Sequence, residues 1–266
     1  MARNNSFVKL DGTLDNLTFY RRNGENFVKS KSTISRARIM NDPKFKRTRE
    51  NMREFGGAAI AGKSFRTAFA GSAQKFGDIY ISARMTGIMK RIVGSGPGIR
   101  GERELLISDS HELIRGFEFN SGETFDSRFF RLSQLPMIRP DRNSVAWDLQ
   151  PFSPDDSVKA PEGATHFRMV FAAGYVSDFT YNFAEKTYKA LNPEFSGMSG
   201  HVVSDAYALS DALTPLMELE IVLATAAAIP LDVSVVVGTG ITFYQSINGE
   251  LYELARGSVM KVAVTG

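Results

Sequence analysis

Residues 57–64 have the types and spacing of a phosphate-binding loop. They read Gly-Ala-Ala-Ile-Ala-Gly-Lys-Ser and fit the pattern G-x-x-x-x-G-K-[ST], whose backbone N–H groups, lysine and hydroxyl hold phosphates and Mg²⁺. That motif follows a buried strand, whereas residues 44–56 are highly charged, and no later apolar run ends in a metal-binding aspartate. We interpret the match as coincidental and keep nucleotide hydrolysis as a minor alternative.

The other residue types used in catalysis show no arrangement that a reaction needs. The chain has no cysteine, so a thiolate nucleophile and a cysteine zinc site are excluded. Its histidines are 55 and 35 residues apart: His111, His166 and His201. The acidic pair 155–156 lies among prolines, and Glu218 and Glu220 alternate onto one strand face. We therefore predict that the protein is not an enzyme and uses no cofactor or metal.

Charge divides the 266-residue chain into two parts. Residues 1–100 contain 20 Lys and Arg against 7 Asp and Glu, a net charge of +13, whereas residues 101–266 contain 12 against 22, a net charge of −10. The glycine-rich stretch 94–101 marks the change and is interpreted as a hinge between two domains, 1–100 and 101–266. Such asymmetry favours a polyanionic partner or head-to-tail contact between copies.

The amino-terminal residues 6–31 are predicted to form a β-meander, with runs at 7–10, 17–20 and 26–29. Asn23-Gly24 between the last two runs suits a tight hairpin turn, because both central residues of that turn need positive φ. Residues 30–41 are basic and show no sustained period, so we expect an extended arm.

Asp42 and Pro43 then mark a helix start, since the carboxylate can accept from free backbone N–H groups and proline is tolerated in the first turn. The predicted buried side of this helix recurs at near-heptad spacing: Phe45, Met52, Phe55, Ala59 and Phe69. A second helix is predicted over 72–93 and ends at Gly94. Its predicted buried side comprises Phe76, Ile79, Tyr80, Ala83 and Ile88.

Short apolar or alternating runs recur through the acidic part between turn signals. They lie at 104–107, 116–119, 127–132, 144–149, 166–172, 219–224, 232–237, 241–245, 251–254 and 259–264. Because no amphipathic helices separate them, the fold class is predicted as α+β and β-rich: an N-terminal β-meander plus two helices, then a C-terminal antiparallel β-sandwich, immunoglobulin-like or similar.

One hairpin pattern occurs twice. Thr18-Phe19-Tyr20 followed by Asn23-Gly24 is repeated at 242–244 and 248–249. The simpler interpretation is that hairpins converge on aromatic and Asn-Gly residues. The alternative is that the first hairpin adds to a sheet edge of another copy.

The best binding candidates are the cations and aromatic residues of the amino-terminal part. The proposed contact residues are Phe19, Tyr20, Arg21, Arg22, Arg36, Arg38, Lys46, Arg49 and Arg53. Clustered Lys and Arg bind polyanions by releasing counterions, and neighbouring aromatic rings can stack on bases. The same cations can instead meet the acidic half of a neighbouring subunit, or remain a solvated face.

Several segments resemble a family of proteins found in Bacteroidota for which no activity is established. They are Gly12–Tyr20, which reads GTLDNLTFY, together with residues 38–43, 47–51, 160–168 and 243–252. The resemblance spans most of the chain and implies no catalytic residue.

We therefore expect a non-enzymatic structural subunit that assembles head to tail, with its basic hairpin and arm on the acidic β-domain of a neighbour. Its concrete form would be a filament, fibre or virion-associated assembly. The alternative is a nucleic-acid-binding protein that uses the same basic surface. The start of the chain lacks the apolar core of a secretory signal and no run is long enough for a membrane span, so we expect cytoplasmic synthesis without membrane insertion.

Overall fold

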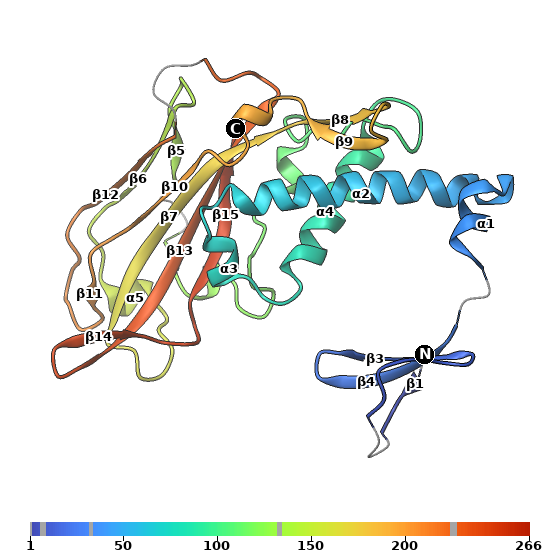
Figure 1. The fold of residues 1–266 in the computed structure, drawn as a ribbon. Helices are drawn as coiled ribbons and strands as arrows, with labels where there is room; N and C mark the ends of the chain where they lie inside the picture. The colour runs from blue at the N-terminus through green and yellow to red at the C-terminus, as the bar shows by residue number, and fades with distance from the viewer. Residues whose placement is uncertain (1, 6–8, 32–33, 132–134, 224–227) are drawn as a thin grey trace. The chain divides into compact units, whose positions relative to one another are not determined.

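The computed structural model describes residues 2–5, 9–31, 34–131, 135–223 and 228–266, and its fold is α+β and β-rich (Figure 1). The backbone divides into two compact units, residues 1–49 and 50–266. The glycine-rich stretch 94–101, interpreted from the sequence as a hinge, lies inside the second unit.

The first unit contains an antiparallel four-stranded sheet in the order β1-β4-β3-β2. Its strands are β1 (Ala2–Arg3), β2 (Gly12–Leu14), β3 (Leu17–Arg22) and β4 (Glu25–Ser30). Asn23 and Gly24 have φ values of 52° and 80°, which confirms the predicted hairpin. Of the predicted run 7–10, residues 7–8 lie outside the described residues, and residues 9–10 are not in a strand.

The predicted extended arm is wrong for residues 36–41, which form helix α1 (Arg36–Asn41). The Ser35 side chain accepts from the backbone N–H of Arg38 and caps this helix, a local signal that the prediction overlooked. The helix start at Asp42 is confirmed, because Asp42 Oδ1 accepts from the Lys44 N–H at 2.9 Å. A 3₁₀ turn, η1 (Pro43–Phe45), then leads into helix α2 (Lys46–Thr67).

The second predicted helix is instead two helices, α3 (Ser72–Phe76) and α4 (Ile81–Ser95). Gly77 separates them in an extended conformation, and a Cβ there would lie 2.3 Å from the carbonyl oxygen of Ala73. The break turns Ile79 outward with 77% of its surface exposed, and Tyr80 is exposed as well, so both were wrongly predicted to be buried.

The buried side of α2 also differs from the prediction. Small residues and two glutamates face the interior: Glu50, Glu54, Gly57, Ala58, Ala61 and Gly62, together with Phe65. Met52 and Phe55 are about half exposed on the opposite side. Close packing explains the reversal, because a Cβ at Gly57 would lie 2.4 Å from the ring of Tyr188.

The second unit is built around a curved, antiparallel six-stranded sheet that forms a half-barrel (Figure 1). Its strands are β7 (His166–Ser177), β10 (Ser199–Val203), β11 (Tyr207–Ala208), β13 (Val233–Ile247), β14 (Glu250–Glu253) and β15 (Val259–Thr265). A three-stranded sheet has the order β12-β6-β5, made of β12 (Met217–Val222), β6 (Ser144–Leu149) and β5 (Met137–Ile138). Smaller elements are the hairpin β8 (Phe179–Asn182) and β9 (Thr187–Ala190), helix α5 (Pro154–Ser157), and the 3₁₀ turns η2 (His111–Leu113), η3 (Phe125–Ser127) and η4 (Pro193–Phe195).

Two apolar cores cover the two faces of the six-stranded sheet. On one face, Val170 and Ala172 of β7 and Met260 of β15 pack with α2, α3 and α4. On the other face, Phe171 of β7 packs with Trp147 of β6 and the inner residues of β12. The sequence missed that helices from the amino-terminal part cover one face of the carboxy-terminal sheet.

Two other features of the strand prediction need correction. Residues 104–107, 116–119 and 127–131 contribute only isolated bridges, through Leu105, Glu118 and Phe129. The runs 232–237 and 241–245 belong to the single strand β13. Gly238, which lies between the two runs, makes room for packing, because a Cβ there would lie 2.6 Å from the Met260 side chain.

Candidate interaction surfaces

The strand register sorts the proposed hairpin contacts onto two faces of the N-terminal sheet. Phe19 pairs with Val28, and Tyr20 pairs with Phe27. We use the name apolar face for the side that carries Ala2, Leu14, Leu17, Phe19 and Val28; Arg21 lies at its end, and the polar residues Asn26 and Ser30 share this side. Leu14 is 68% and Leu17 44% exposed. None of the residues described within 1–49 is buried, so this unit has no closed core of its own.

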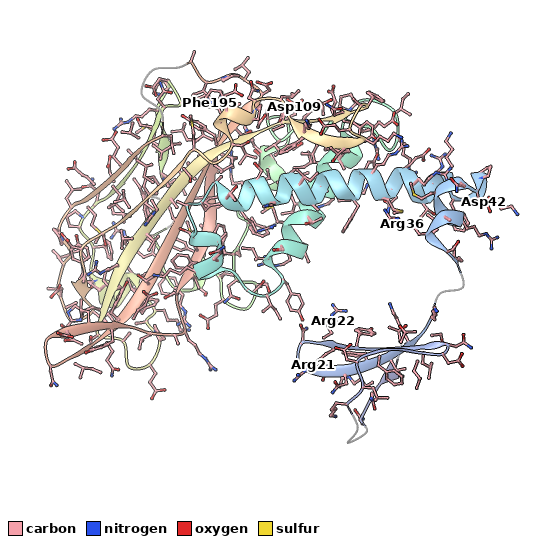
Figure 2. All side chains as sticks on the ribbon, viewed as in Figure 1. Arg21, Arg22, Arg36, Asp42, Asp109 and Phe195 are labelled. Atoms are coloured by element: carbon pink, nitrogen blue, oxygen red, sulfur yellow. The ribbon has the colours of Figure 1, made fainter. Side chains whose placement is uncertain are left out.

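The opposite face of the N-terminal sheet is satisfied by its own side chains. Tyr20 stacks on Phe27 with ring centroids 5.7 Å apart, and the Lys29 amine lies 5.5 Å from the Tyr20 ring. Arg3 pairs with Glu25 at 3.3 Å. Arg21 and Arg22 end β3 beside the hairpin turn (Figure 2). Both are exposed, Arg21 on the apolar face and Arg22 on the opposite face.

Two of the other predicted cations have structural contacts within the first unit. Arg49 Nη1 donates to the carbonyl oxygens of Ile39 at 2.7 Å and Asp42 at 2.9 Å, so it fixes the turn between α1 and α2. Arg38 lies 3.5 Å from the Asp42 carboxylate and 6.0 Å from the centre of the Phe45 ring. Exposed Arg36 and Lys46 complete the set on the surface.

Arg53 belongs to the second unit and also has internal partners. Its guanidinium lies 2.5 Å from Glu102 and 5.7 Å from the centre of the Tyr181 ring. Within the predicted contact set, Arg21, Arg22, Arg36 and Lys46 are exposed. Arg38 and Arg53 are also exposed, with 59% and 40% of their side chains accessible, but these two and Arg49 have partners within their own chain.

A buried carboxylate, Glu54, lies one residue further along α2. Only 1% of its side chain is exposed. It accepts from Arg103 Nε at 2.8 Å and Nη2 at 2.9 Å, from Lys90 Nζ at 2.7 Å and from the Gly101 N–H at 2.8 Å. Burial raises the pKa of Glu54, but these hydrogen bonds and charges outweigh it and lower the pKa to about 2. The cluster joins α2, α4 and the segment after α4.

Glu118 shows the opposite electrostatic situation. Burial raises its pKa to about 7, and nearby Asp126 adds to this, while the Phe125 N–H, Lys261 and Arg84 oppose it. The Phe125 N–H donates to Glu118 Oε2 at 3.0 Å. A carboxyl with a raised pKa binds its proton more tightly in the folded state, so it destabilises the fold as pH rises from about 4.5 through about 7.

We accordingly expect Glu118→Gln to raise the free energy of unfolding by about 1–2 kcal/mol at pH 8, because the amide needs no ionisation and can still accept from Phe125. At pH 4 the variant and the parent should unfold alike. Urea unfolding at the two pH values measures both quantities. Glu112→Gln, at a carboxylate 84% exposed, controls for the loss of one charge. An equal gain in the free energy of unfolding at pH 4 would contradict the raised pKa of Glu118.

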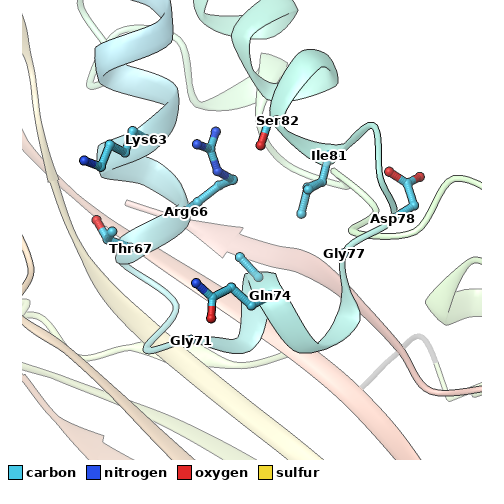
Figure 3. A pocket seen from close by; sticks show the side chains of 10 residues that line it. Lys63, Arg66, Thr67, Gly71, Gln74, Gly77, Asp78, Ile81 and Ser82 are labelled. Atoms are coloured by element: carbon cyan, nitrogen blue, oxygen red, sulfur yellow. The ribbon is translucent and has the colours of Figure 1, made fainter. Parts of the chain in front are cut away.

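A cleft of about 570 Å³ lies between the end of α2, helix α3 and the start of α4 (Figure 3). Figure 3 shows the Arg66 guanidinium between α2 and Ser82 of α4, while the Lys63 amine points the other way. Arg66 Nη1 donates to the Gly62 carbonyl at 3.0 Å. The acid that lines this cleft, Asp78, already accepts from Tyr80, Arg84 and Ser121. Arg66 is therefore the cation that this cleft offers to an anion (Figure 3), while the Asp78 carboxylate is held by its own hydrogen bonds.

The phosphate-loop match at 57–64 lies within α2, where the backbone N–H groups are used by the helix. It cannot cradle a phosphate. His111 Nε2 lies 3.0 Å from Ser234 Oγ, but Ser234 is fully buried and out of reach of a substrate. Burial lowers the pKa of His111, with Arg142 and Arg115 adding to the effect. Within the part of the chain that the structure describes, no group of three or more His, Asp or Glu could hold a metal ion.

The outer face of the three-stranded sheet is a further surface, and it carries the two glutamates that alternate in the sequence, Glu218 and Glu220. Register places Glu218 opposite Asp148, and Glu220 opposite Ala146. Both glutamates and Asp148 are exposed. On the same face Met137 is 52% and Val222 61% exposed. The alternation of Glu218 and Glu220 was visible in the sequence, but their cross-strand partner was not.

Comparison of the chain with protein-family models, with curated proteins and with solved structures gives no match. The resemblance to the Bacteroidota family therefore stays a prediction. Among the described residues, no helix has the length and apolar character needed to cross a membrane.

Proposed function

We propose that the protein is a non-enzymatic structural subunit that assembles head to tail, with its basic N-terminal unit on the acidic β-domain of a neighbouring copy. Residues 1–49 contain 12 Lys and Arg against 4 Asp and Glu, a net charge of +8, whereas residues 50–266 contain 20 against 25, a net charge of −5. Opposite charges on two units of one chain favour contact between copies.

The observation that carries this proposal is the lack of any buried side chain among the described residues of the N-terminal unit. A sheet requires an apolar face packed on another layer to be stable. Its apolar face has Leu14 and Leu17 exposed, so a second layer would supply the missing core.

In this proposal the six- and three-stranded sheets, which share one apolar core, form the β-sandwich that the sequence predicted. The contact residues are the exposed Arg21, Arg22, Arg36 and Lys46, with Phe19 and Tyr20 on the hairpin. Because two different surfaces meet, the contact repeats into a filament or closes into a ring. A fibre or a virion-associated assembly is the biological form that we propose.

Assembly is tested by sedimentation velocity on protein freed of nucleic acid. We expect the full chain to form oligomers that grow with concentration at about 20 mM salt and shrink at about 500 mM, because salt screens the charges. Deletion of residues 1–41 should give monomers, since both apolar cores of the second unit remain. A full chain that stays monomeric at high concentration and low salt would refute the proposal.

Nucleic-acid binding by the same cations is the second candidate, favoured by the cluster of exposed Arg and Lys on the first unit. Fluorescence anisotropy with labelled single-stranded DNA tests it. Tight binding by a protein that remains monomeric without DNA would favour this function over assembly.

A further inference from the structure

We propose that the outer face of the β12-β6-β5 sheet is the surface that receives the apolar face of the N-terminal sheet from a second copy. The inference rests on the proposed head-to-tail assembly and names the two faces that meet. We call the receiving side the acidic face, made by Asp148, Glu218 and Glu220 with Met137, Ala146 and Val222.

The first observation concerns charge within the acidic face. Asp148 and Glu218 are directly opposite each other on antiparallel strands, an arrangement that brings like charges close and destabilises a sheet. Glu220 has a cation near it, Arg139, at 3.9 Å. A cationic partner placed over Asp148 and Glu218 would remove this repulsion.

The second observation concerns apolar surface. The inner residues of β12 are buried, with Leu219 6% and Ile221 4% exposed, whereas Val222 of the outer face is 61% exposed. Met137 pairs with Ala146 on the same side and is 52% exposed. The acidic face thus has an exposed apolar side chain on each of its two outer strands beside the carboxylates, a mixed composition typical of a protein contact.

The N-terminal sheet carries the complementary arrangement. Leu17, Phe19 and Arg21 alternate onto one side of β3, so apolar side chains lead to a cation at the end of the strand. Val28 of β4 lies beside Phe19 on that side. If the apolar side chains cover Val222 and Met137, the guanidinium of Arg21 is available for the carboxylates.

The two faces also match in length. The strands β3, β4, β6 and β12 have six residues each, or about 20 Å of extended chain. The two long strands of each sheet can therefore pack face to face along their length, with their side chains interdigitating. The N-terminal sheet would then gain the core that it lacks, and the acidic face would gain its counter-charge.

A charge-exchange experiment on the full chain tests this pairing. Arg21→Glu alone and Glu218→Arg alone should each weaken association about tenfold at low salt, because each places like charges against each other across the contact. The two substitutions in one chain should restore association to near the parent value. The new arginine side chain faces Asp148 within its own sheet, so Glu218→Arg is compatible with the fold.

Matched variants separate the proposed faces from charge in general. Lys44→Glu changes an exposed cation of η1, which lies outside the N-terminal sheet and outside the proposed contact set, and Asp155→Lys changes an exposed acid of α5. Both should alter association less than threefold. Val222→Ser should weaken it about fivefold, whereas Val203→Ser, on the helix-covered face of the six-stranded sheet, should not.

The outcomes distinguish the two proposals. If the parent protein is monomeric, head-to-tail assembly fails and the named faces fail with it. If the parent assembles but Glu218→Arg and Val222→Ser assemble equally well, only the acidic face is refuted. Loss of association in the single variants without recovery in the combined chain would refute the pairing of Arg21 with Glu218.

Discussion

Replacement of Glu54 by glutamine is expected to lower the free energy of unfolding by about 3 kcal/mol at pH 7. The amide loses the charge that faces Arg103 and Lys90, whose side chains are 22% and 26% exposed. Because these two cations are partly accessible to water, we expect the loss of stability to lie at the lower end of the range observed when a buried ion pair is broken. Urea-induced unfolding, followed by circular dichroism, measures the loss.

The pH dependence of the parent protein provides a second readout for Glu54. Its folded pKa of about 2 lies below the ordinary value of 4.5, so its stabilising contribution is complete above about pH 5 and is lost as pH falls towards 2. The difference in free energy of unfolding between the parent protein and Glu54→Gln should therefore become smaller as pH falls from about 5 towards 2. Arg53→Gln, which removes the more exposed ion pair with Glu102, should cost less than about 1 kcal/mol. Equal losses in the two variants would contradict the structural role given to Glu54.

Gly174→Ala is expected to destabilise the second unit by about 3 kcal/mol. Gly174 lies on the face of β7 that the helices cover, and a Cβ there would be 2.3 Å from the carbonyl oxygen of Ala68. That oxygen belongs to the backbone after α2 and cannot rotate away, so the sheet and the helix must separate. Thermal unfolding by calorimetry measures the effect as a lower midpoint.

Gly87→Ala is the matched control, and we expect it to stabilise the protein where Gly174→Ala destabilises it. Gly87 is an exposed residue inside α4, and a Cβ there meets no atom within 4 Å. Alanine should stabilise the protein by about 0.5–1 kcal/mol, because glycine loses more backbone entropy in a helix. A neutral Gly174→Ala beside a stabilising Gly87→Ala would show that helix and sheet are not in close contact at Ala68.

Local chemistry explains which parts of the fold could be predicted from the sequence. The Asn23-Gly24 turn needs two residues at positive φ, and the helix start at Asp42 needs one side chain near a free N–H. Both depend on neighbours in the chain. The same holds for the hairpin at Asn248 and Gly249, whose φ values are 53° and 85°. Ser35 is a signal of the same kind and could have indicated α1.

Features that depend on distant residues could not be predicted. The periodicity of Met52 and Phe55 indicated a buried face, but the helix buries its small residues, because Tyr188 of β9 packs directly against Gly57. Nothing near Glu54 in the sequence shows that Lys90 and Arg103 will neutralise it. Helix α2 therefore departs from the usual pattern, in which a helix buries its apolar residues and exposes its charged ones.

The proposed contact residues also divide into those whose environment depends on chain neighbours and those whose environment depends on distant residues. Exposure of Arg21 and Arg22 followed from their position beside a hairpin turn, whereas the internal roles of Arg49 and Arg53 depend on α1 and on Glu102. The pairing of Asp148 with Glu218 joins residues 70 positions apart, so only the sheet register reveals the acidic face.

The long strand β13 has a mechanical consequence. Of its fifteen residues, residues 233–244 pair with β7 on one side, while residues 236–241 pair with β15 and residues 244–247 with β14 on the other. Tension applied along these strands loads the ladders in shear, so many bonds must rupture together, whereas a peeling force would open them one after another. A subunit pulled along β13 would thus resist stretching more than one whose strands are peeled apart.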